Sequence, residues 1–277
     1  MRLRVDLAYD GAGFSGWAKQ PSLPSVQQAL ETALSKALRL DASEVKTVVA
    51  GRTDSGVHAT GQVCHLDLPA DHPLVAAPHR VDGELLARLR GALGKNSAIW
   101  VERVSIAPEG FDARFSPLRR RYEYRVADAA ATKDPRHAGH TLWISDSLNV
   151  SAMNRLGKAL LGLHDWASFC RARKGATTIR TLEKFTWARE SDGVLCGTVA
   201  ADAFCHSMVR SLVGAAIAVG RGTLEISEVL ALRDKAERTS AWKTMPAHGL
   251  TLVEVVYPKD RELARRAELT RAPRGPL

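Results

Sequence analysis

Hydrophobic and polar positions alternate or recur at helical spacing along much of the chain, and these patterns predict a mixture of strands and helices. Residues 2–9 alternate apolar and polar side chains, which predicts a strand with one buried face. Apolar residues recur at helical spacing over residues 26–38, which predicts a helix that packs on a sheet. Ser25 stands at the expected N-cap of this helix, and Gln28 three residues later completes a capping box.

The same patterns continue along the chain and indicate two halves. Further strands are predicted at 45–50, 62–68, 98–106, 120–126, 194–201 and 250–257, and further helices at 85–93, 151–163 and 204–219. Because strands and helices are interspersed, we expect the α/β (α+β) class, with a cleft between the halves. The pattern restarts near Pro108, which places an N-terminal subdomain at 1–109, a C-terminal subdomain at 110–258, and a basic, partly mobile tail at 259–277.

Composition and charge favour a soluble protein with a polyanionic partner. Of the 277 residues, 45% are hydrophobic and 25% are charged, which is ordinary usage for a globular protein. The formal net charge is +9 and the sequence pI is about 9.6, so nucleic acid is the favoured partner. No apolar run approaches the roughly 20 residues that a membrane span needs. The charged N-terminus, with Arg2 and Arg4, argues against export and favours the cytoplasm.

The cysteines give no sign of a metal site or of a disulfide framework. Cys64, Cys170, Cys196 and Cys205 show no C-x-x-C spacing, so we expect reduced thiols. Cys64 and His65 also do not form a zinc site, because neighbouring residues on a strand point to opposite faces.

The segment 51–62 holds the densest group of residues with catalytic potential. It combines an acid, a base, hydroxyls and a histidine between predicted strands, which is where active sites concentrate. A solvated turn, in which Asp54 bonds its own backbone, is the plain alternative. A serine nucleophile elbow is excluded because Thr53 and Val57 occupy the positions around Ser55 that require glycine. A phosphate-binding loop is excluded because the Gly-Lys-Ser/Thr motif is absent.

Residues 51–59, GRTDSGVHA, followed by Gly61-Gln62-Val63, closely resemble the signature of the tRNA pseudouridine synthase A family. Further blocks that carry the resemblance stand in family order between about residue 5 and about residue 258: Tyr9-Asp10-Gly11, Gly16-Trp17, Val26-Gln27, Phe111-Asp112-Ala113-Arg114-Phe115-Ser116, Arg121-Tyr122-Glu123-Tyr124, His164-Asp165, Ser168-Phe169, Phe204, His206, Met208-Val209-Arg210, Leu250 and Tyr257-Pro258. The chain departs from the family at Ala18, where glutamine is common, and at Ser55, where alanine is frequent.

The resemblance implies a fold, a reaction and a substrate. The fold would be the pseudouridine synthase fold, two similar mixed α/β subdomains with the catalytic cleft between them. The reaction would isomerise uridine to pseudouridine at positions 38, 39 and 40 of the tRNA anticodon stem-loop. Family members work without cofactor or metal and as homodimers that grip one tRNA. An isomerisation has no redox change and needs no energy donor, which agrees with the absence of a cofactor.

The resemblance also assigns roles to four residues. Asp54 matches the catalytic aspartate, which either attacks C1′ covalently or abstracts the 2′ proton to give a glycal; the sequence leaves both routes open. Arg210 matches the basic partner that keeps this carboxylate ionised. Tyr122 matches the tyrosine that stacks on the uracil, and Arg52 the residue that helps to extract the base. His58 and Gln62 are expected to structure the loop.

Plain structural alternatives remain for these residues and for the whole protein. Arg210 would otherwise be the polar side of a long apolar helix, and Tyr122 a strand-packing aromatic residue. Basic clusters at 119–121 and 171–174 are candidate walls of an RNA surface, or only solvated faces. Two other functions stay open at this point. One is an RNA-binding module with an inert loop, and the other is a hydrolase that releases free uracil.

Overall fold

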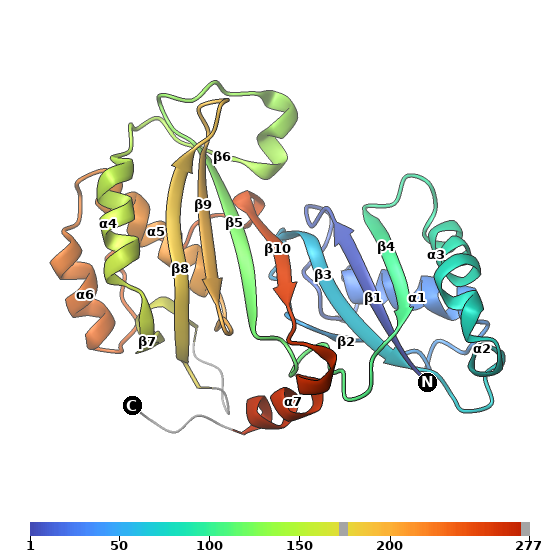
Figure 1. Ribbon diagram of the computed structural model, residues 1–277. Coiled ribbons are helices and arrows are strands. Elements are labelled where there is room, and N and C mark those ends of the chain that lie inside the picture. Colours follow the sequence, from blue (N-terminus) through green and yellow to red (C-terminus); the bar gives the residue numbers. More distant parts are fainter. Residues whose placement is uncertain (172–176, 273–277) are drawn as a thin grey trace. The chain divides into compact units, whose positions relative to one another are not determined.

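The computed structural model describes residues 1–171 and 177–272 and divides them into two compact units (Figure 1). Unit 1 comprises Met1–Leu118 and Leu252–Ala272, and unit 2 comprises Arg119–Thr251. Unit 1 therefore continues past residue 109, where the sequence placed the boundary, and also includes the C-terminal segment Leu252–Ala272.

Unit 1 is built on a sheet with the strand order β4-β1-β3-β10, in which β1 pairs antiparallel with β3 and with β4, and β2 pairs antiparallel with β3. Its strands are β1 (Arg2–Tyr9), β2 (Val48–Val49), β3 (His58–Asp67), β4 (Ile99–Ile106) and β10 (Leu250–Val256), the last belonging to unit 1 from Leu252 on. Strand β1 buries every second residue, which confirms the predicted alternation. Strand β3 begins at His58 rather than at Gln62, so the polar loop before it is shorter than expected.

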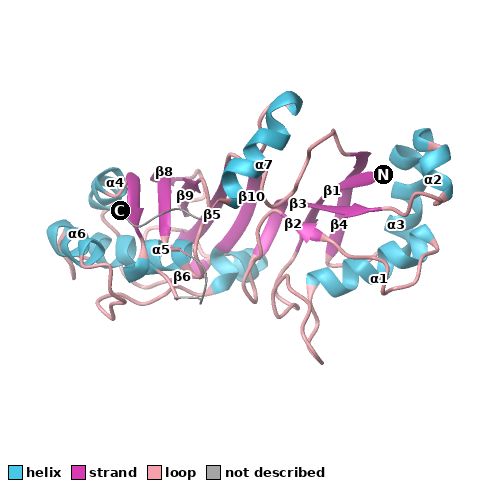
Figure 2. Cartoon of the chain, turned by 90° about the horizontal axis from the view of Figure 1, so that it is seen from below, coloured by secondary structure: helices cyan, strands magenta, loops and turns pink. Residues whose placement is uncertain are grey.

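The helices of unit 1 are α1 (Val26–Leu38), α2 (Pro73–Ala76), α3 (Leu86–Leu93) and α7 (Leu263–Arg271), and short helical turns lie at Pro78–Arg80, Val81–Leu85 and Asp260–Glu262. The N-cap of α1 is confirmed, since Ser25 Oγ accepts the N–H of Gln28 at 3.3 Å. Leu30 and Leu34 of its apolar stripe are fully buried. Helices α1 and α3 pack side by side (Figure 2).

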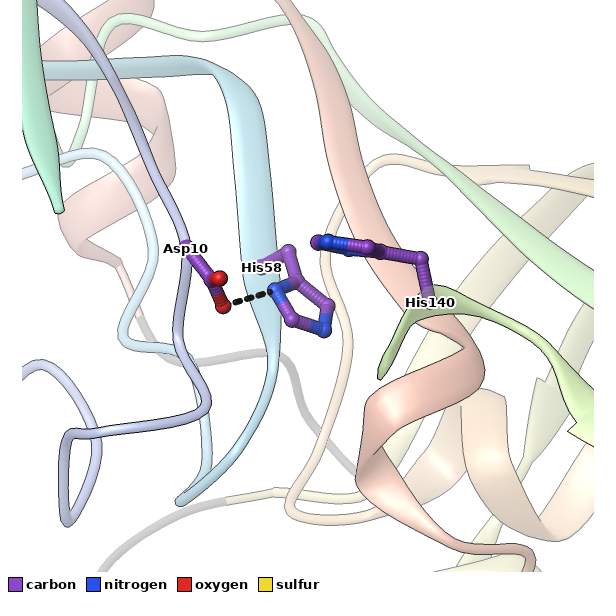
Figure 3. A group of neighbouring side chains, drawn as sticks. All are labelled: Asp10, His58 and His140. Atoms are coloured by element: carbon purple, nitrogen blue, oxygen red, sulfur yellow. Dashed lines mark ion pairs between the residues drawn. The ribbon is translucent and has the colours of Figure 1, made fainter. Parts of the chain in front are cut away.

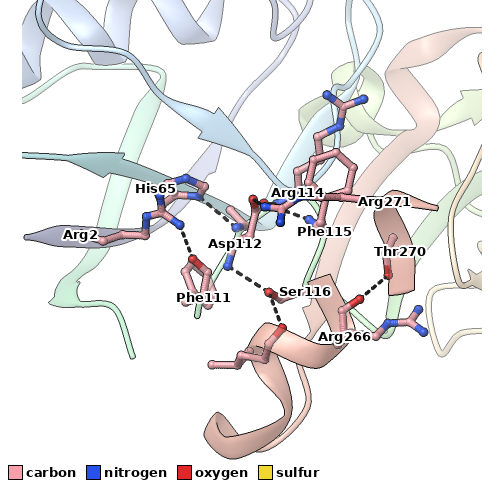
Figure 4. Close-up of polar contacts among 12 residues, drawn as sticks. Arg2, His65, Phe111, Asp112, Arg114, Phe115, Ser116, Arg266, Thr270 and Arg271 are labelled. Carbon is pink, nitrogen blue, oxygen red and sulfur yellow. Dashed lines mark hydrogen bonds and ion pairs between the residues drawn. The ribbon is translucent and has the colours of Figure 1, made fainter. Parts of the chain in front are cut away.

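Helix α7 lies within the segment that the sequence suggested to be a partly mobile tail. Leu263 and Ala267, one helical turn apart, are buried against the unit. Ser116 Oγ accepts the N–H of Asp112 at 2.9 Å and donates to the carbonyl of Leu263 at 3.2 Å (Figure 4). Arg271 donates to the Asp112 carboxylate at 2.9 Å. The tail therefore contains a docked helix, and its residues 273–277 lie outside the described part of the chain.

Unit 2 is built on the strand order β5-β9-β8-β7, antiparallel throughout, with β6 parallel to β5. Its strands are β5 (Arg119–Ala127), β6 (Leu142–Trp143), β7 (Gly162–Asp165), β8 (Ile179–Arg189) and β9 (Leu195–Ala201). Its helices are α4 (Val150–Ala159), α5 (Met208–Gly220) and α6 (Ile226–Asp234), with short helical turns at Pro135–His140, Ala167–Phe169 and Ala247–Gly249. Both units are mixed α/β, as the sequence predicted.

The boundaries of two predicted helices in unit 2 are wrong for identifiable reasons. The helix predicted at 151–163 ends at Ala159, because Gly162 adopts a φ of 114° and begins β7. The helix predicted from 204 begins at Met208, because Ser207 takes a left-handed conformation with a φ of 63°. Within residues 1–171 and 177–272, no helix has the length and apolar character that crossing a bilayer requires.

Candidate active site

The candidate catalytic loop is residues 51–57 of unit 1, which join β2 to β3. Thr53 is buried, whereas Arg52 before it is exposed and Asp54 after it is half-buried. The N–H of Val57 donates to the carbonyl of Asp54 at 3.2 Å and closes a turn directly after the acid. The loop therefore buries Thr53 between an exposed Arg52 and a half-buried Asp54.

Two glycines allow the segment before α1 to lie against this loop. Gly16 has a φ of 103°, and a Cβ at this position would lie 2.9 Å from the carbonyl oxygen of Thr53. The N–H of Trp17 donates to that same carbonyl at 3.1 Å. A Cβ on Gly11 would overlap the carbonyl of Val57. Only glycine permits this close backbone approach at both ends of the loop.

A buried hydrogen-bond network lies beneath the loop. Gln62 is fully buried, and its Nε2 donates to the carbonyl of Gly51 at 2.9 Å and to the hydroxyl of Tyr9 at 3.1 Å. The hydroxyls of Tyr9 and Thr53 are 2.8 Å apart. Burial raises the pKa of Tyr9 to about 12, so this hydroxyl keeps its proton at physiological pH. The expectation that Gln62 structures the loop is confirmed.

His58 fastens the C-terminal end of the loop to the segment after β1. Its Nδ1 lies 3.0 Å from the N–H of Gly11 and also 3.0 Å from a carboxylate oxygen of Asp10 (Figure 3). One nitrogen cannot accept from Gly11 and donate to Asp10 at once. A neutral ring accepts the backbone N–H, and a ring protonated at Nδ1 pairs with the carboxylate. In both states His58 structures the loop, as the sequence indicated.

In unit 2, Tyr122 lies on β5 and is 7% exposed. Its ring meets Phe204 edge-on, with centroids 5.2 Å apart and an interplanar angle of 89°. Tyr124 lies two residues further along the strand, on the same face, and donates its hydroxyl to the carbonyl of Pro246 at 2.8 Å. Tyr122 is therefore a buried aromatic ring held in a fixed orientation by its neighbour Phe204.

Arg210 lies in the first turns of α5 and is held by the segment that leads to β10. Its Nε donates to the carbonyl of Met245 at 2.6 Å, and the N–H of Met245 donates back to the carbonyl of Arg210 at 3.1 Å. Burial raises the pKa of Tyr124, and the charge of Arg210 acts in the opposite direction. Arg210 thus brings its charge close to the aromatic face of β5 rather than to the solvated side of a helix.

The cysteines of unit 2 contradict the expectation of reduced thiols throughout the chain. Cys170 and Cys205 form a disulfide, with their Cα atoms 5.8 Å apart. The N–H of Arg171 donates to the carbonyl of His206 at 3.1 Å next to this bond. The pairing joins residues that lie 35 positions apart, which no local spacing rule detects. The disulfide therefore fastens the segment that leads into α5 and Arg210.

In the part of the chain that the structure describes, the basic clusters at 119–121 and 171–174 do not present a continuous row of exposed cations that could bind phosphates. Arg120 is buried and donates to the carbonyl of Asp202 at 2.6 Å. Arg121 pairs with Glu123 at 2.6 Å, and only Arg119 of this cluster is fully exposed. In the second cluster Arg171 is exposed, and residues 172–174 lie outside the described part of the chain.

The structure thus brings Asp54 and Arg52 together on one loop of unit 1 and places Tyr122 and Arg210 on neighbouring elements of unit 2. Sequence reasoning did not assign a role to Tyr9, Thr53 or Phe204. Tyr9 occurs in one of the blocks that carry the resemblance, and its hydroxyl on the buried face of a strand was the available signal. A buried hydroxyl needs a partner, and the partner here is the catalytic loop.

Comparisons with known proteins identify the family of the chain. A family model described as tRNA pseudouridine synthase matches residues 157–258. A protein named tRNA pseudouridine synthase A from Leifsonia xyli subsp. xyli is 54% identical over 98% of this chain and 96% of its own length. Proteins of the same name from Frankia casuarinae and Streptomyces griseus subsp. griseus are 50% and 49% identical, over 100% and 96% of this chain and 96% and 92% of their own lengths.

The chain belongs to the tRNA pseudouridine synthase family. The match spans both units, because the relatives cover nearly the whole chain. Membership in this synthase family therefore applies to the whole chain and not to unit 2 alone. The fold class predicted from the sequence is confirmed.

Proposed function

We propose that this synthase isomerises uridine to pseudouridine in tRNA, at positions 38, 39 and 40 of the anticodon stem-loop. The observation that carries the proposal is the loop at 51–57, which holds the half-buried Asp54 beside the exposed Arg52. The high identity to synthases over nearly the full chain supports the reaction. The net charge of +9 supports a polyanionic substrate.

In this proposal the Asp54 carboxylate acts on the ribose while the uracil is detached. By the covalent route, it attacks C1′ and displaces N1 of the uracil, and after the base turns, C5 attacks C1′ and expels the carboxylate. By the glycal route, it removes the proton from C2′ as the uracil leaves, and returns this proton when C5 adds to C1′. In both routes the proton on C5 is lost, N1 gains a proton, and reactant and product are isomers.

The other three residues assist this chemistry. The Arg210 guanidinium is the basic partner that stabilises the ionised carboxylate by its opposite charge. Tyr122 stacks on the flipped uracil, and Phe204 fixes the orientation of its ring. Arg52, exposed next to the acid, fills the space that the extracted base leaves in the stem. No redox change occurs, so the reaction runs without a cofactor. We also propose that the enzyme acts as a homodimer in the cytoplasm.

The test uses unmodified tRNA transcripts with tritium at C5 of uridine. We expect the wild-type protein to release tritium and the Asp54→Ala variant to release none while it still binds tRNA. Mapping of the product should place pseudouridine at positions 38 to 40. Release of free uracil would replace the proposal with a hydrolase. Tight tRNA binding without tritium release by the wild-type protein would replace it with an inert RNA-binding module.

A further inference from the structure

The buried network beneath the catalytic loop has a defined direction of hydrogen bonding. The side-chain amide nitrogen of Gln62 must face the carbonyl of Gly51, because only a donor satisfies a carbonyl oxygen there. The same nitrogen therefore donates its second proton to the hydroxyl of Tyr9. Since the Tyr9 oxygen accepts this bond, its own proton is available for Thr53 Oγ1 at 2.8 Å. The network thus runs from β3 through β1 to the loop.

This network reaches the loop on both sides of Arg52 and immediately before Asp54. It bonds the main chain at Gly51 and the side chain at Thr53, and Trp17 bonds the main chain at Thr53. Tyr9, Thr53 and Gln62 are 4%, 6% and 0% exposed, so water does not compete for these bonds. Thr53 is thus held by its side chain and by its carbonyl, directly between Arg52 and Asp54.

We propose that Tyr9, Thr53 and Gln62 are positioning residues that hold Asp54 and Arg52 in the orientation the isomerisation needs. None of the three touches the reacting atoms. Each acts through the main chain or side chain of the loop, and the effect of losing one hydroxyl is a displacement of Asp54. The kinetic part of this inference rests on the proposed function, because it is measured as pseudouridine formation.

Three substitutions and one matched control test the inference. Tyr9→Phe and Thr53→Val each remove one hydroxyl and keep the shape of the side chain, and Thr53→Ser restores the hydroxyl. The control is Tyr257→Phe, which removes a hydroxyl that donates at 2.9 Å to the carbonyl of Ala113, also in unit 1 but outside the loop. Tyr9→Phe and Tyr257→Phe each remove one phenolic hydroxyl that makes a hydrogen bond, so a purely structural effect should be shared by these two variants.

We expect Tyr9→Phe and Thr53→Val to lower kcat about tenfold to a hundredfold, since small misplacements of a catalytic group have effects of this size. The Kd for tRNA should change less than about twofold, because phosphate contacts dominate affinity. Thr53→Ser should recover most of the activity, and Tyr257→Phe should retain it. Equal kcat losses in Tyr9→Phe and Tyr257→Phe, or no recovery in Thr53→Ser, would overturn the inference.

Amide hydrogen exchange gives a readout that needs no catalysis. Tyr9→Phe and Thr53→Val should accelerate exchange in the peptide that covers residues 51–57, and Tyr257→Phe should leave it unchanged. If the wild-type protein formed no pseudouridine, the proposed function would fail, and exchange would still decide whether these residues hold the loop. Unchanged exchange at 51–57 in both loop variants would then reject the positioning role.

Discussion

The two units of this synthase hold their functional side chains by different means. In unit 1, Asp54 lies on an irregular loop that is fixed by buried side-chain hydrogen bonds from Tyr9 and Gln62. In unit 2, Tyr122 and Arg210 lie on β5 and α5, where regular backbone hydrogen bonds set their positions. An irregular segment has no ladder of such bonds, so a few polar side chains must define it. Loss of one polar group that only supports a functional side chain should therefore affect activity more in unit 1 than in unit 2.

The largest effect should come from the acid on the loop. Asp54→Asn keeps the size of the side chain and removes its charge and nucleophilicity, so kcat should fall roughly 10⁴-fold or more, as for other essential catalytic groups. Tritium release from C5-labelled tRNA measures it. Asp67→Asn is the control, since Asp67 is an exposed carboxylate of the same unit, paired with Arg2. Activity of Asp54→Asn above a tenth of the wild-type value would show that Asp54 is not the essential catalytic group, and that the loop of unit 1 does not carry the chemistry.

The next effect concerns the stability of unit 2. The disulfide between Cys170 and Cys205 should contribute about 2–4 kcal/mol to the free energy of unfolding, by restricting the unfolded chain. Cys170→Ser, or reduction of the wild-type protein, should lower the urea midpoint by the corresponding amount. Cys196→Ser is the matched control, because Cys196 is a free cysteine of the same unit. An identical midpoint with and without reductant would show that this bond does not stabilise unit 2.

The elements that were predicted from the sequence share a regular local pattern. Strand β1 alternates without interruption, and α1 repeats its apolar positions over 13 residues. Strand β8 was missed, because its buried residues Ile179, Leu182, Phe185 and Trp187 fit neither a strand nor a helix period. A register shift between Leu182 and Lys184 breaks the alternation, and only the neighbouring strand β9 reveals it.

The candidate site shows the same division between local and long-range information. Asp54 and Arg52 could be proposed from the sequence because the whole loop is one contiguous motif. The network beneath it was not found, because Tyr9, Thr53 and Gln62 come from three segments that meet only in the folded unit. The disulfide was missed for the same reason, with 35 positions between its cysteines. Side-chain partners that are distant in the sequence leave no local pattern to detect.

A pH-dependent effect on stability should arise in unit 1. Burial, followed by the charge of Arg2, lowers the pKa of His65 to about 4, and its Nδ1 accepts the N–H of Ala113 at 3.0 Å. Because the unfolded chain binds this proton near pH 6.5 and the folded one only near pH 4, stability is full above pH 6.5 and declines as the pH falls towards 4. The decline should reach at most about 3 kcal/mol.

The variant His65→Asn separates this contribution from other titrating groups. Asparagine places an acceptor oxygen near the position of Nδ1 and does not titrate, so the Ala113 bond can persist. Urea unfolding at pH 7 and pH 5 should show a smaller loss of stability for the variant than for the wild-type protein. Equal losses in both would mean that His65 does not couple protonation to the stability of unit 1.

The smallest effect should be found where helix α7 meets the turn at Asp112. The Arg271 side chain is 53% exposed and that of Asp112 is 10% exposed, so water screens the charge of Arg271 while the carboxylate of Asp112 is largely shielded from water. Arg271→Gln should lower the free energy of unfolding by less than about 1 kcal/mol. Asp112→Ala should cost more, about 1–2 kcal/mol, because the N–H groups of Arg114 and Phe115 lose the oxygen that accepts them at 2.9 and 3.0 Å.

The relative losses of stability in Arg271→Gln and Asp112→Ala test whether a buried polar side chain also defines this second irregular segment of unit 1. If the turn depends on the buried carboxylate rather than on its exposed partner, Arg271→Gln in the background of Asp112→Ala should have almost no further effect in urea unfolding. A larger loss for Arg271→Gln than for Asp112→Ala would mean that the helix, and not the buried acceptor, defines this turn. In that case the catalytic loop would depend on buried polar side chains, and the turn at Asp112 would not.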